Sequence, residues 1–194
     1  MKLFKSKEPN IFHYVTAVTH KRLPIFRNEK ACQIFIDTLV ELKSIHPFKL
    51  IGYVIMPDHF HLIFNPIESD VSVILRKLKG KSAKLILDWL EEEGHDTSLR
   101  KLELNIKGRR HAVWLKDSSA IDLFSHKFLR QKLRYIHLNP VEAGLCSEPK
   151  DWKWSSFCAY FPKYGGDVPV GIDLQAYWNE EELLGYAVAA GCSL

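Results

Sequence analysis

Residues 48–56 form a nearly continuous apolar run, Phe-Lys-Leu-Ile-Gly-Tyr-Val-Ile-Met. A strand with so few polar positions has to be covered on both faces, so this run predicts a buried central strand. Pro57 and Asp58 follow it with a turn signal. Residues 59–64, His-Phe-His-Leu-Ile-Phe, then predict the returning strand of a hairpin. An antiparallel hairpin therefore forms the centre of the expected fold.

The patterns on either side of this hairpin predict an α+β fold. The further elements expected from composition and spacing are a strand over 11–19, a helix over 29–45 capped by Asn28, a helix over 71–93 capped by Asp70, a strand over 111–116 and a helix over 119–138 stopped by Pro140. This order matches the ferredoxin-like split βαβ motif, with an antiparallel sheet of four to five strands. Helices cover one face of such a sheet, and a further helix can dock near the open face. Residues 94–110 resist assignment, and a last helix is expected near 173–190.

The composition is that of a folded, mildly basic protein. With 194 residues, of which 46% are hydrophobic, the chain suits one domain with an appended tail. Its formal net charge of +4 is modest for a nucleic-acid-binding domain. The sequence has no apolar stretch of the length that a membrane span needs, roughly 18 residues, and no secretory signal. The four cysteines are dispersed without a CxxC pair, so we expect reduced thiols and a cytoplasmic protein rather than a zinc ribbon.

Two histidines separated by one residue are the first candidate for chemistry. On a strand, His59 and His61 project from the same face, while Phe60 points to the other face and the core. Two imidazoles placed in this way can chelate a divalent cation. Histidines that are only exposed or hydrogen-bonded would give the same pattern. Asp58 could be a turn residue, a hydrogen-bonding partner of a ligand or a third ligand, and the turn is the favoured interpretation.

A polar stripe on the predicted helix before Pro140 is the second candidate. Gln131, Tyr135 and Asn139 are each four residues apart and therefore share one helix face. A stripe centred on a tyrosine near a helix end could lie against the open face of the sheet. A half-buried tyrosine on an ordinary amphipathic helix would also fit this spacing.

Three motifs in this order resemble those of the single-tyrosine HUH transposases. Residues 56–62, Met-Pro-Asp-His-Phe-His-Leu, are similar to the "MPNHxH" hairpin of that family. Residues 135–145, Tyr-Ile-His-Leu-Asn-Pro-Val-Glu-Ala-Gly-Leu, are similar to the "YIHxNPVxAGL" segment of its REP-associated branch. Residues 152–157, Trp-Lys-Trp-Ser-Ser-Phe, resemble the "W-S-S-Y" stretch, with Phe157 in place of the tyrosine. The resemblance covers roughly residues 10 to 161.

The resemblance implies an enzyme that cuts and rejoins single-stranded DNA through a 5′-phosphotyrosine. Tyr135 matches the nucleophile, and His59, His61 and Asn139 match the ligands of a divalent metal ion, Mg²⁺ or Mn²⁺. The implied partner is single-stranded DNA with hairpin-forming repeats, and the choice between a monomer and a homodimer stays open. We expect the nuclease domain over residues 8–163 and a tail over residues 164–194.

Basic and aromatic residues outside these motifs are candidates for DNA contacts. Those expected to follow phosphates are Arg76, Lys77, Lys81, Lys84, Arg109 and Arg110, and those expected to stack on bases are Trp152 and Trp154. A solvated helix face and the edge of a packed core are the alternatives. The alternative functions are a single-stranded nucleic-acid binder without activity and a metal-dependent phosphodiesterase that uses water.

Overall fold

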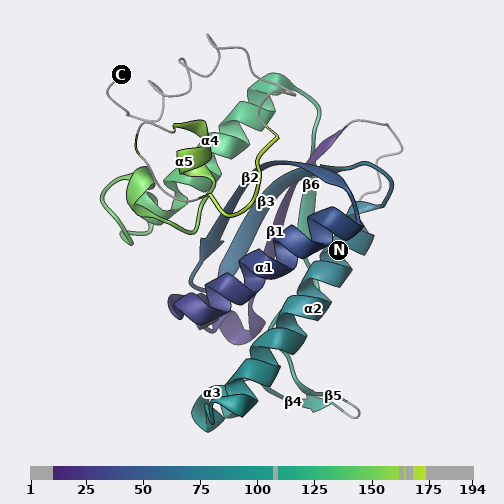
Figure 1. The fold of residues 1–194 in the computed structure, drawn as a ribbon, viewed down its shortest axis with the longest axis vertical. Coiled ribbons are helices and arrows are strands. Elements are labelled where there is room, and N and C mark those ends of the chain that lie inside the picture. Colours follow the sequence, from purple (N-terminus) through teal and green to yellow (C-terminus); the bar gives the residue numbers. More distant parts are fainter. Residues whose placement is uncertain (1–10, 107–108, 162–163, 165–167, 174–194) are drawn as a thin grey trace.

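The structure is a computed structural model, and its described residues are 11–106, 109–161, 164 and 168–173. The strands are β1 (Phe12–Val18), β2 (Phe48–Met56), β3 (His59–Pro66), β4 (Glu103–Ile106), β5 (Arg109–His111) and β6 (Ser119–Leu123). The helices are α1 (Glu29–Ile45), α2 (Val71–Glu92), α3 (Asp96–Lys101), α4 (His126–Glu142) and α5 (Phe157–Tyr160). Short 3-10 turns lie at His20–Arg22, Ile25–Arg27 and Pro149–Asp151. Figure 1 shows α1, α2 and α4 packed around one twisted sheet, with α3, β4 and β5 at the far end of α2.

The sheet has the strand order expected of a ferredoxin-like fold. Its four strands lie in the order β2-β3-β1-β6 and are all antiparallel to their neighbours. α1 connects β1 to β2, and α2 begins the connection from β3 to β6. The α+β prediction with a split βαβ core is therefore confirmed.

The prediction that residues 48–56 form a central strand is wrong, because β2 lies at an edge of the sheet. The strand is nevertheless buried on both faces, since side chains of β2 enter both apolar clusters of the molecule. Its outer edge is also covered: the backbone N–H of Ile55 donates to the carbonyl of Trp154 at 2.9 Å, and Val54 forms a bridge with Ser155. A covered edge strand and a central strand leave the same apolar pattern in the sequence.

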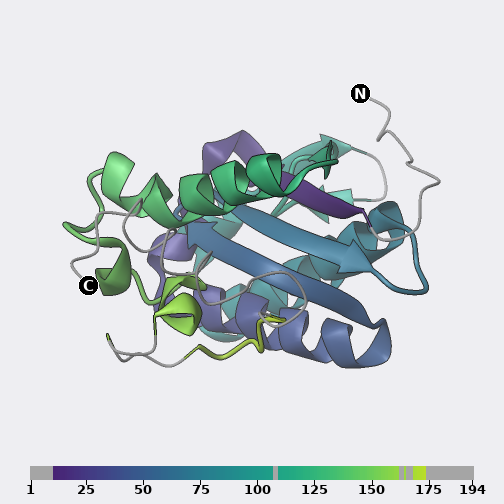
Figure 2. The same cartoon turned by 90° about the horizontal axis from the view of Figure 1, so that it is seen from above.

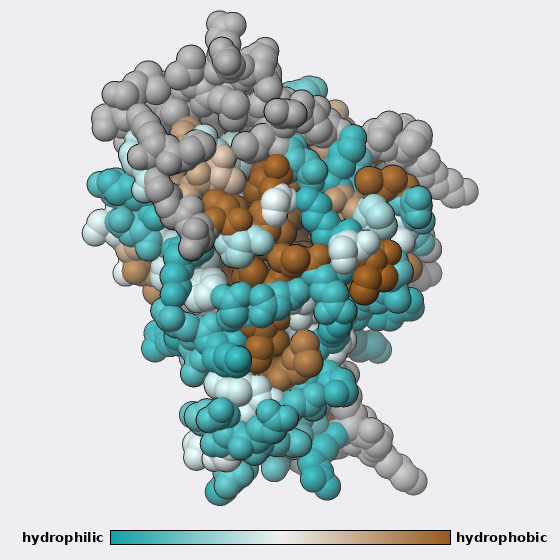
Figure 3. All heavy atoms as spheres, viewed as in Figure 1, coloured by the Kyte–Doolittle hydropathy of each residue, from teal (hydrophilic) through white to brown (hydrophobic). Residues whose placement is uncertain are grey.

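One face of the sheet packs against α1 and α2. α1 begins after Asn28, whose side chain accepts a hydrogen bond from the N–H of Lys30 at 2.8 Å. Phe35 on this helix meets Phe60 of β3, with ring centres 4.7 Å apart. The solvent side of α1 is not purely polar, since Ile45 at its end is 60% exposed. Figure 3 shows this outer surface as largely hydrophilic with an apolar area near its middle.

The opposite face of the sheet packs against α4, as Figure 2 shows from above. Leu133 and Ile136 of α4 enter a second apolar cluster with Ile51, Val54 and other residues of the sheet. Gly52 allows the close approach: a Cβ there would lie 2.6 Å from Cδ1 of Leu133 and 2.9 Å from Cδ1 of Ile136. The expected docking of the tyrosine-bearing helix near the open face is therefore confirmed, and a glycine on β2 makes it possible.

The chain between residues 111 and 142 differs from expectation. The predicted strand over 111–116 is wrong, because Trp114 makes only an isolated bridge with Thr19 and turns its ring into the core. The fourth strand of the sheet is β6, which pairs along β1, so the predicted start at residue 119 of the helix over 119–138 is also wrong. α4 begins after Ser125, whose Oγ accepts from the N–H of Phe128 at 3.2 Å. Residues 119–123 thus form a strand because they pair with the edge of β1 that β3 leaves free.

Pro140 does not end this helix, contrary to the prediction. It lies inside α4, which continues to Glu142. A proline leaves its own nitrogen without a hydrogen bond and crowds the carbonyl four residues earlier, but here the next turn still closes through other groups. The N–H of Ala143 donates to the carbonyl of Asn139, and the N–H of Leu145 donates to the carbonyl of Pro140, both at 2.9 Å. Asn139 therefore sits within the helix rather than at its last residue.

The segment that resisted assignment contains α3 and the β4–β5 hairpin, and Figure 1 shows them together at one end of the molecule. The expected last helix near 173–190 lies, apart from its first residue, outside the described residues. Asp173 itself is attached to β2, because its N–H donates to the carbonyl of Leu50 at 2.8 Å and its carboxylate accepts from the N–H of Leu50 at 2.7 Å. In the described part of the chain, no helix has the length and apolar character needed to cross a membrane.

Candidate active site

His59 and His61 lie on the face of the sheet that packs against α4. Phe60, between them, is fully buried in the opposite cluster, as the alternation along β3 requires. The two imidazole rings are 4.9 Å apart between centres and nearly perpendicular. This pair forms one side of the candidate site.

His61 is buried and is held by polar groups on both ring nitrogens. Its Nδ1 lies 2.9 Å from the hydroxyl of Tyr14 and 2.7 Å from that of Thr16. The amide Nδ2 of Asn139 lies 3.3 Å from Nε2 and can only donate, so Nε2 accepts and the ring proton is on Nδ1. Burial, with the charges of His59 and Lys132, lowers the pKa of His61 to about 3. The imidazole is therefore neutral near pH 7.

His59 is oriented by the residue before it. Its Nδ1 lies 2.6 Å from a carboxylate oxygen of Asp58. Partial burial alone would raise the pKa of Asp58, but hydrogen bonds from His59 and Arg22 and their charges lower it below its usual value. Asp58 is thus ionised and paired with His59. Of its alternative roles, the structure supports the hydrogen-bonding partner in addition to the favoured turn residue.

Tyr135 is brought to these histidines by α4. Its side chain is 41% exposed, and its ring centre lies 5.6 Å from that of His61 and 6.3 Å from that of Tyr14. Asn139, one helical turn further on, is buried against His61, whereas Gln131, one turn before, is exposed. The face of α4 nearest to the histidines therefore carries an accessible hydroxyl and a buried amide.

The donor set fits a divalent metal ion. Both imidazoles use Nδ1 for contacts within the protein, which is how metal-binding histidines are usually oriented. Among the described residues, no group of three His, Cys, Asp or Glu side chains could hold a metal ion. The amide of Asn139 is in contact with His61, so its oxygen is the candidate for a third protein ligand. Neutral imidazole and amide ligands suit a divalent ion that also binds oxygen atoms of a substrate.

The basic residues predicted to contact DNA on α2 lie across the sheet from Tyr135, because α2 packs on the other face. Two of them have acidic neighbours: Lys81 pairs with Glu41 of α1, and Lys84 pairs with Asp88 at 2.7 Å. Arg76 and Lys77 are exposed. The contact of these four residues with DNA stays a prediction.

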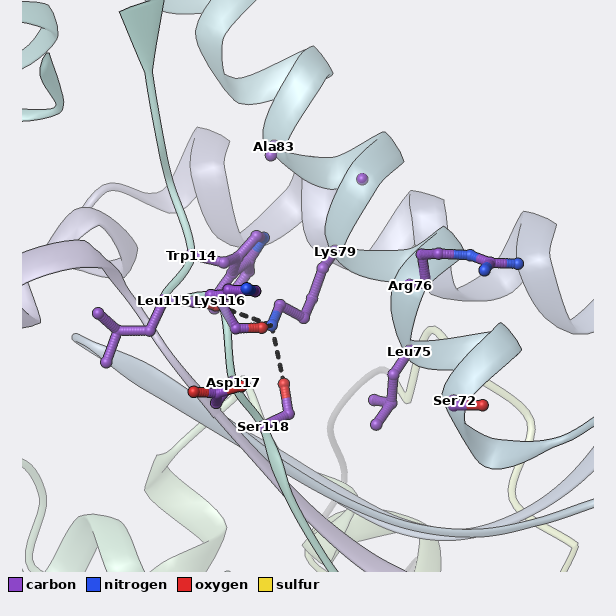
Figure 4. Close-up of a pocket in the computed structure, with 11 residues that line it drawn as sticks. Ser72, Leu75, Arg76, Lys79, Ala83, Trp114, Leu115, Lys116, Asp117 and Ser118 are labelled. Atoms are coloured by element: carbon purple, nitrogen blue, oxygen red, sulfur yellow. Dashed lines mark hydrogen bonds between the residues drawn. The ribbon is translucent and has the colours of Figure 1, made fainter. Parts of the chain in front are cut away.

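A groove of about 400 Å³ lies between α2 and residues 114–118. Figure 4 shows that Lys79 crosses it toward that segment while Arg76 points away. The Lys79 ammonium donates to the carbonyls of Leu115 and Lys116 at 2.8 and 3.1 Å and to the hydroxyl of Ser118 at 2.8 Å. Lys79 therefore fastens the chain leading into β6 to α2.

The remaining predicted DNA contacts are in two other places. Arg109 and Arg110 belong to β5 in the hairpin beside α3, where Arg110 is exposed. Trp152 is half-buried, and its indole N–H donates to the carbonyl of Ile55 at 3.0 Å. Trp154 is also half-buried and packs at the border of the α1/α2 cluster. Both indoles are thus anchored by the fold, and base stacking by them stays a prediction.

Sequence reasoning missed the residues that surround His61 from other elements. Tyr14 and Thr16 reach it from β1, where Thr16 lies directly opposite His61 in the sheet register. Lys132 lies one turn before Tyr135, and its ammonium is 4.7 Å from the ring centre of Tyr14. A signal for Lys132 was present in the sequence, because residues 127–134 contain Lys127, Arg130, Lys132 and Arg134 with no acidic residue.

Comparison with known proteins agrees with the resemblance read from the motifs. Residues 9–101 match the family described as "Transposase IS200 like", a segment that includes His59 and His61 and ends before Tyr135. A REP-associated tyrosine transposase of Escherichia coli is 25% identical over 130 residues, which is 64% of either chain. A Haemophilus influenzae protein named as a candidate for the same activity is 29% identical over 112 residues, 58% of this chain and 60% of that protein.

The chain thus spans somewhat less than two thirds of the length of these curated relatives. Among solved structures, it resembles a REP-associated tyrosine transposase bound to a REP hairpin, with a TM-score of 0.62. That likeness covers 90% of this chain and 93% of the other at 19% sequence identity. It therefore supports the fold beyond the segment that the family match covers.

Proposed function

Residues 9–101 of this chain match the family described as "Transposase IS200 like", and from that match we propose that the chain is a single-tyrosine DNA strand transferase. In the proposed reaction it cleaves single-stranded DNA, keeps one end as a 5′-phosphotyrosine and joins that end to another strand. Tyr135 is the proposed nucleophile. His59, His61 and Asn139 are the proposed ligands of a divalent metal ion, Mg²⁺ or Mn²⁺.

One juxtaposition carries this proposal. The accessible ring of Tyr135 lies 5.6 Å from the ring of His61, while Asn139 of the same helix lies 3.3 Å from Nε2 of His61. A nucleophile and the proposed ligands therefore come together on one face, although they are far apart in the sequence. A tyrosine with a purely structural role in the apolar packing of α4 would have no need to be 41% exposed beside a histidine pair.

The proposed ligands keep the site positively charged when it is loaded. A divalent ion held there would polarise a non-bridging phosphate oxygen and offset the negative charge that develops during attack. Because His61 is buried, its pKa of about 3 keeps the imidazole in the neutral, ligating form. Neutral ligands leave the ion its full charge.

The proposed step exchanges one phosphate ester for another. The Tyr135 oxygen bonds to phosphorus, the bond from phosphorus to the 3′ oxygen breaks, and the tyrosine proton is lost as the 3′ oxygen gains one. Since the ester is conserved in the phosphotyrosine, a 3′-hydroxyl can later attack it and reseal the strand without ATP. A side-chain nucleophile, unlike water, keeps this reverse reaction available.

Charge around Tyr135 supports an anionic substrate. The ammonium of Lys132 lies 5.6 Å from the ring centre of Tyr135, and within the described chain it pairs with no carboxylate. Neighbouring positions of α4 add further cations without acidic residues between them. The solved relative is bound to a REP hairpin, and we extend this to propose that the present chain acts on single-stranded DNA with hairpin-forming repeats.

A denaturing gel tests this proposal. A hairpin-bearing single-stranded oligonucleotide is incubated with the protein and Mn²⁺, in one sample labelled at its 5′ end and in another at its 3′ end. The 3′-labelled fragment should migrate with the protein, and the 5′-labelled fragment should be free. The fully paired duplex of the same sequence serves as a control that should stay intact. Cleavage without an adduct would instead indicate a water-using phosphodiesterase, and binding without cleavage would indicate a non-enzymatic binder.

A further inference from the structure

The loop between β1 and α1 holds the turn between β2 and β3. The backbone N–H and the hydroxyl of Thr19 both donate to the carbonyl of Asp58, at 2.8 and 2.9 Å. The N–H of Phe26 donates to the carbonyl of Pro57 at 3.0 Å. The residue that precedes His59 is therefore fixed by a segment that is distant from it in the sequence.

The same loop contains the strained backbone of the molecule. Lys21 and Arg22 have φ angles of 54° and 53°, and within the described residues they are the non-glycine residues with positive φ. Side chains disfavour this left-handed region, and glycine is the residue that adopts it without strain. An outlier of this kind at consecutive positions points to a function that requires it.

The strained backbone delivers the Arg22 side chain to Asp58. Nη1 of Arg22 donates to one carboxylate oxygen of Asp58 at 2.9 Å, and Nδ1 of His59 lies 2.6 Å from the other. The arginine side chain is 68% exposed, and an ion pair so open to solvent contributes little to folding. The stability of this pair alone therefore does not account for the strain.

An aspartate at this position fixes the imidazole more strictly than the asparagine of the "MPNHxH" motif would. An amide can donate or accept, but an ionised carboxylate can only accept. With its carboxylate held at both oxygens, Asp58 keeps the ring proton of His59 on Nδ1 and leaves the lone pair of Nε2 free. Ligating histidines in metal sites are commonly supported by a carboxylate in this way.

From these contacts we propose that Arg22 is a positioning residue, which acts through Asp58 to hold His59 in the tautomer and orientation that a divalent ion requires. The proposal rests on the metal site of the proposed function. It makes the loop over 19–28 part of the site, although none of its residues is a proposed ligand.

Two glycine variants separate the side chain from the strain. Arg22→Gly and Lys21→Gly both relieve a left-handed residue, but only Arg22→Gly removes the guanidinium. Mn²⁺ binding is followed without DNA by the spin resonance of free Mn²⁺, with His59→Ala to identify binding at this site. We expect the dissociation constant to rise about 10-fold in Arg22→Gly and to stay unchanged in Lys21→Gly. Arg22→Lys should recover part of the loss.

A second readout needs neither metal nor DNA. The ¹⁵N shifts of the His59 ring should report one tautomer, protonated at Nδ1, in the parent and in Lys21→Gly, and a mixture of tautomers in Arg22→Gly and Asp58→Asn. Parent-like Mn²⁺ affinity together with a parent-like ring spectrum in Arg22→Gly would overturn the inference. A protein that binds Mn²⁺ in an Arg22-dependent manner but forms no DNA adduct would overturn the proposed function alone.

Discussion

The two faces of the sheet are built from the same strands but have different chemistry. On β3, Phe60 enters a cluster of fully buried aromatic and aliphatic side chains under α1 and α2. Its neighbour His61 enters a face where polar groups of β1 and α4 surround it. The first face keeps its large side chains from water, whereas the second leaves Tyr135 41% exposed.

This difference indicates how the molecule combines a stable fold with a reactive group. Leu133 and Ile136 anchor one side of α4 on Gly52. This apolar contact allows Tyr135 and Asn139, on a neighbouring stripe of the helix, to lie over polar side chains. β3 packs into the α1/α2 cluster through Phe60 and carries His59 and His61 on its other face. We therefore expect substitutions on the α1/α2 face to change stability and substitutions on the α4 face to change chemistry.

The largest expected effect is that of Tyr135→Phe on the α4 face. Only the hydroxyl is lost, so folding and DNA affinity should stay near those of the parent. Adduct formation should fall by at least about 1,000-fold, as when the nucleophile of other covalent enzymes is removed. The denaturing gel measures the adduct and a native gel measures binding. Normal adduct formation in this variant would assign the nucleophile to another residue.

Adjacent residues of β3 give the next largest contrast. Phe60→Ala removes a fully buried ring and should lower the free energy of unfolding by about 3–5 kcal/mol. His59→Ala, in a half-buried position on the other face, should lower it by about 1 kcal/mol or less while it abolishes metal-dependent cleavage. Urea unfolding and the gel assay measure the two effects. Similar stability losses in both variants would remove the proposed division between the faces.

The elements that hold the first face were largely readable from the sequence. The apolar period and the Asn28 cap predict a helix over 29–45, and α1 has these bounds. Pairing between distant segments could not be predicted from the sequence. Residues 119–123 form a strand because they pair with the edge of β1. β2 is buried at an edge of the sheet because residues 154–155 cover it. Neither contact leaves a local pattern.

For the candidate site, the sequence likewise predicted what local spacing determines. The i,i+2 spacing on a strand sets His59 beside His61, and the i,i+4 spacing on a helix sets Tyr135 beside Asn139. The partners of these residues were beyond prediction. Thr16 contacts His61 because the two residues are opposite each other in the strand register. Arg22 reaches Asp58 through a left-handed backbone, which its residue type does not predict.

Glycine-to-alanine substitutions at two positions compare the packing of α4 with that of α2. At Gly52 an added Cβ would meet Leu133 at 2.6 Å, so Gly52→Ala should lower the free energy of unfolding by about 1–3 kcal/mol and reduce adduct formation by shifting α4. At Gly80 in α2 an added Cβ meets nothing within 4 Å, so Gly80→Ala should raise stability by about 0.5–1 kcal/mol. Thermal unfolding measures both signs. A neutral Gly52→Ala would mean that α4 does not depend on this contact.

The amide-bearing residues on either side of Tyr135 give a smaller effect. Asn139→Ala should raise the Mn²⁺ concentration needed for half-maximal cleavage by about 10-fold, because Asn139 lies against His61. Gln131→Ala is the matched control, since Gln131 is exposed, and it should behave like the parent. A metal titration in which only the Gln131 variant is impaired would transfer the third ligand to Gln131 and leave the role of Tyr135 intact.

The smallest expected effect is a pH dependence that enters through the α4 face. Burial lowers the pKa of His61 and of His137 from the ordinary value of 6.5, so both are neutral when folded and take up protons when unfolded. Their contribution to stability is therefore present above pH 6.5 and is lost as the pH falls toward 3. Between pH 7 and 6 each should lower the free energy of unfolding by about 0.7 kcal/mol.

Denaturant unfolding at about pH 7.0, 6.5, 6.0 and 5.5 measures how the free energy of unfolding changes with pH. His137 is fully buried, and its Nε2 lies 2.7 Å from Oγ of Ser156, so His137→Gln removes the titrating group and retains a partner for that hydroxyl. The slope of the free energy of unfolding against pH should then fall by the contribution of about one proton taken up on unfolding. An unchanged slope in His137→Gln would mean that His137 does not contribute to the acid sensitivity of the fold.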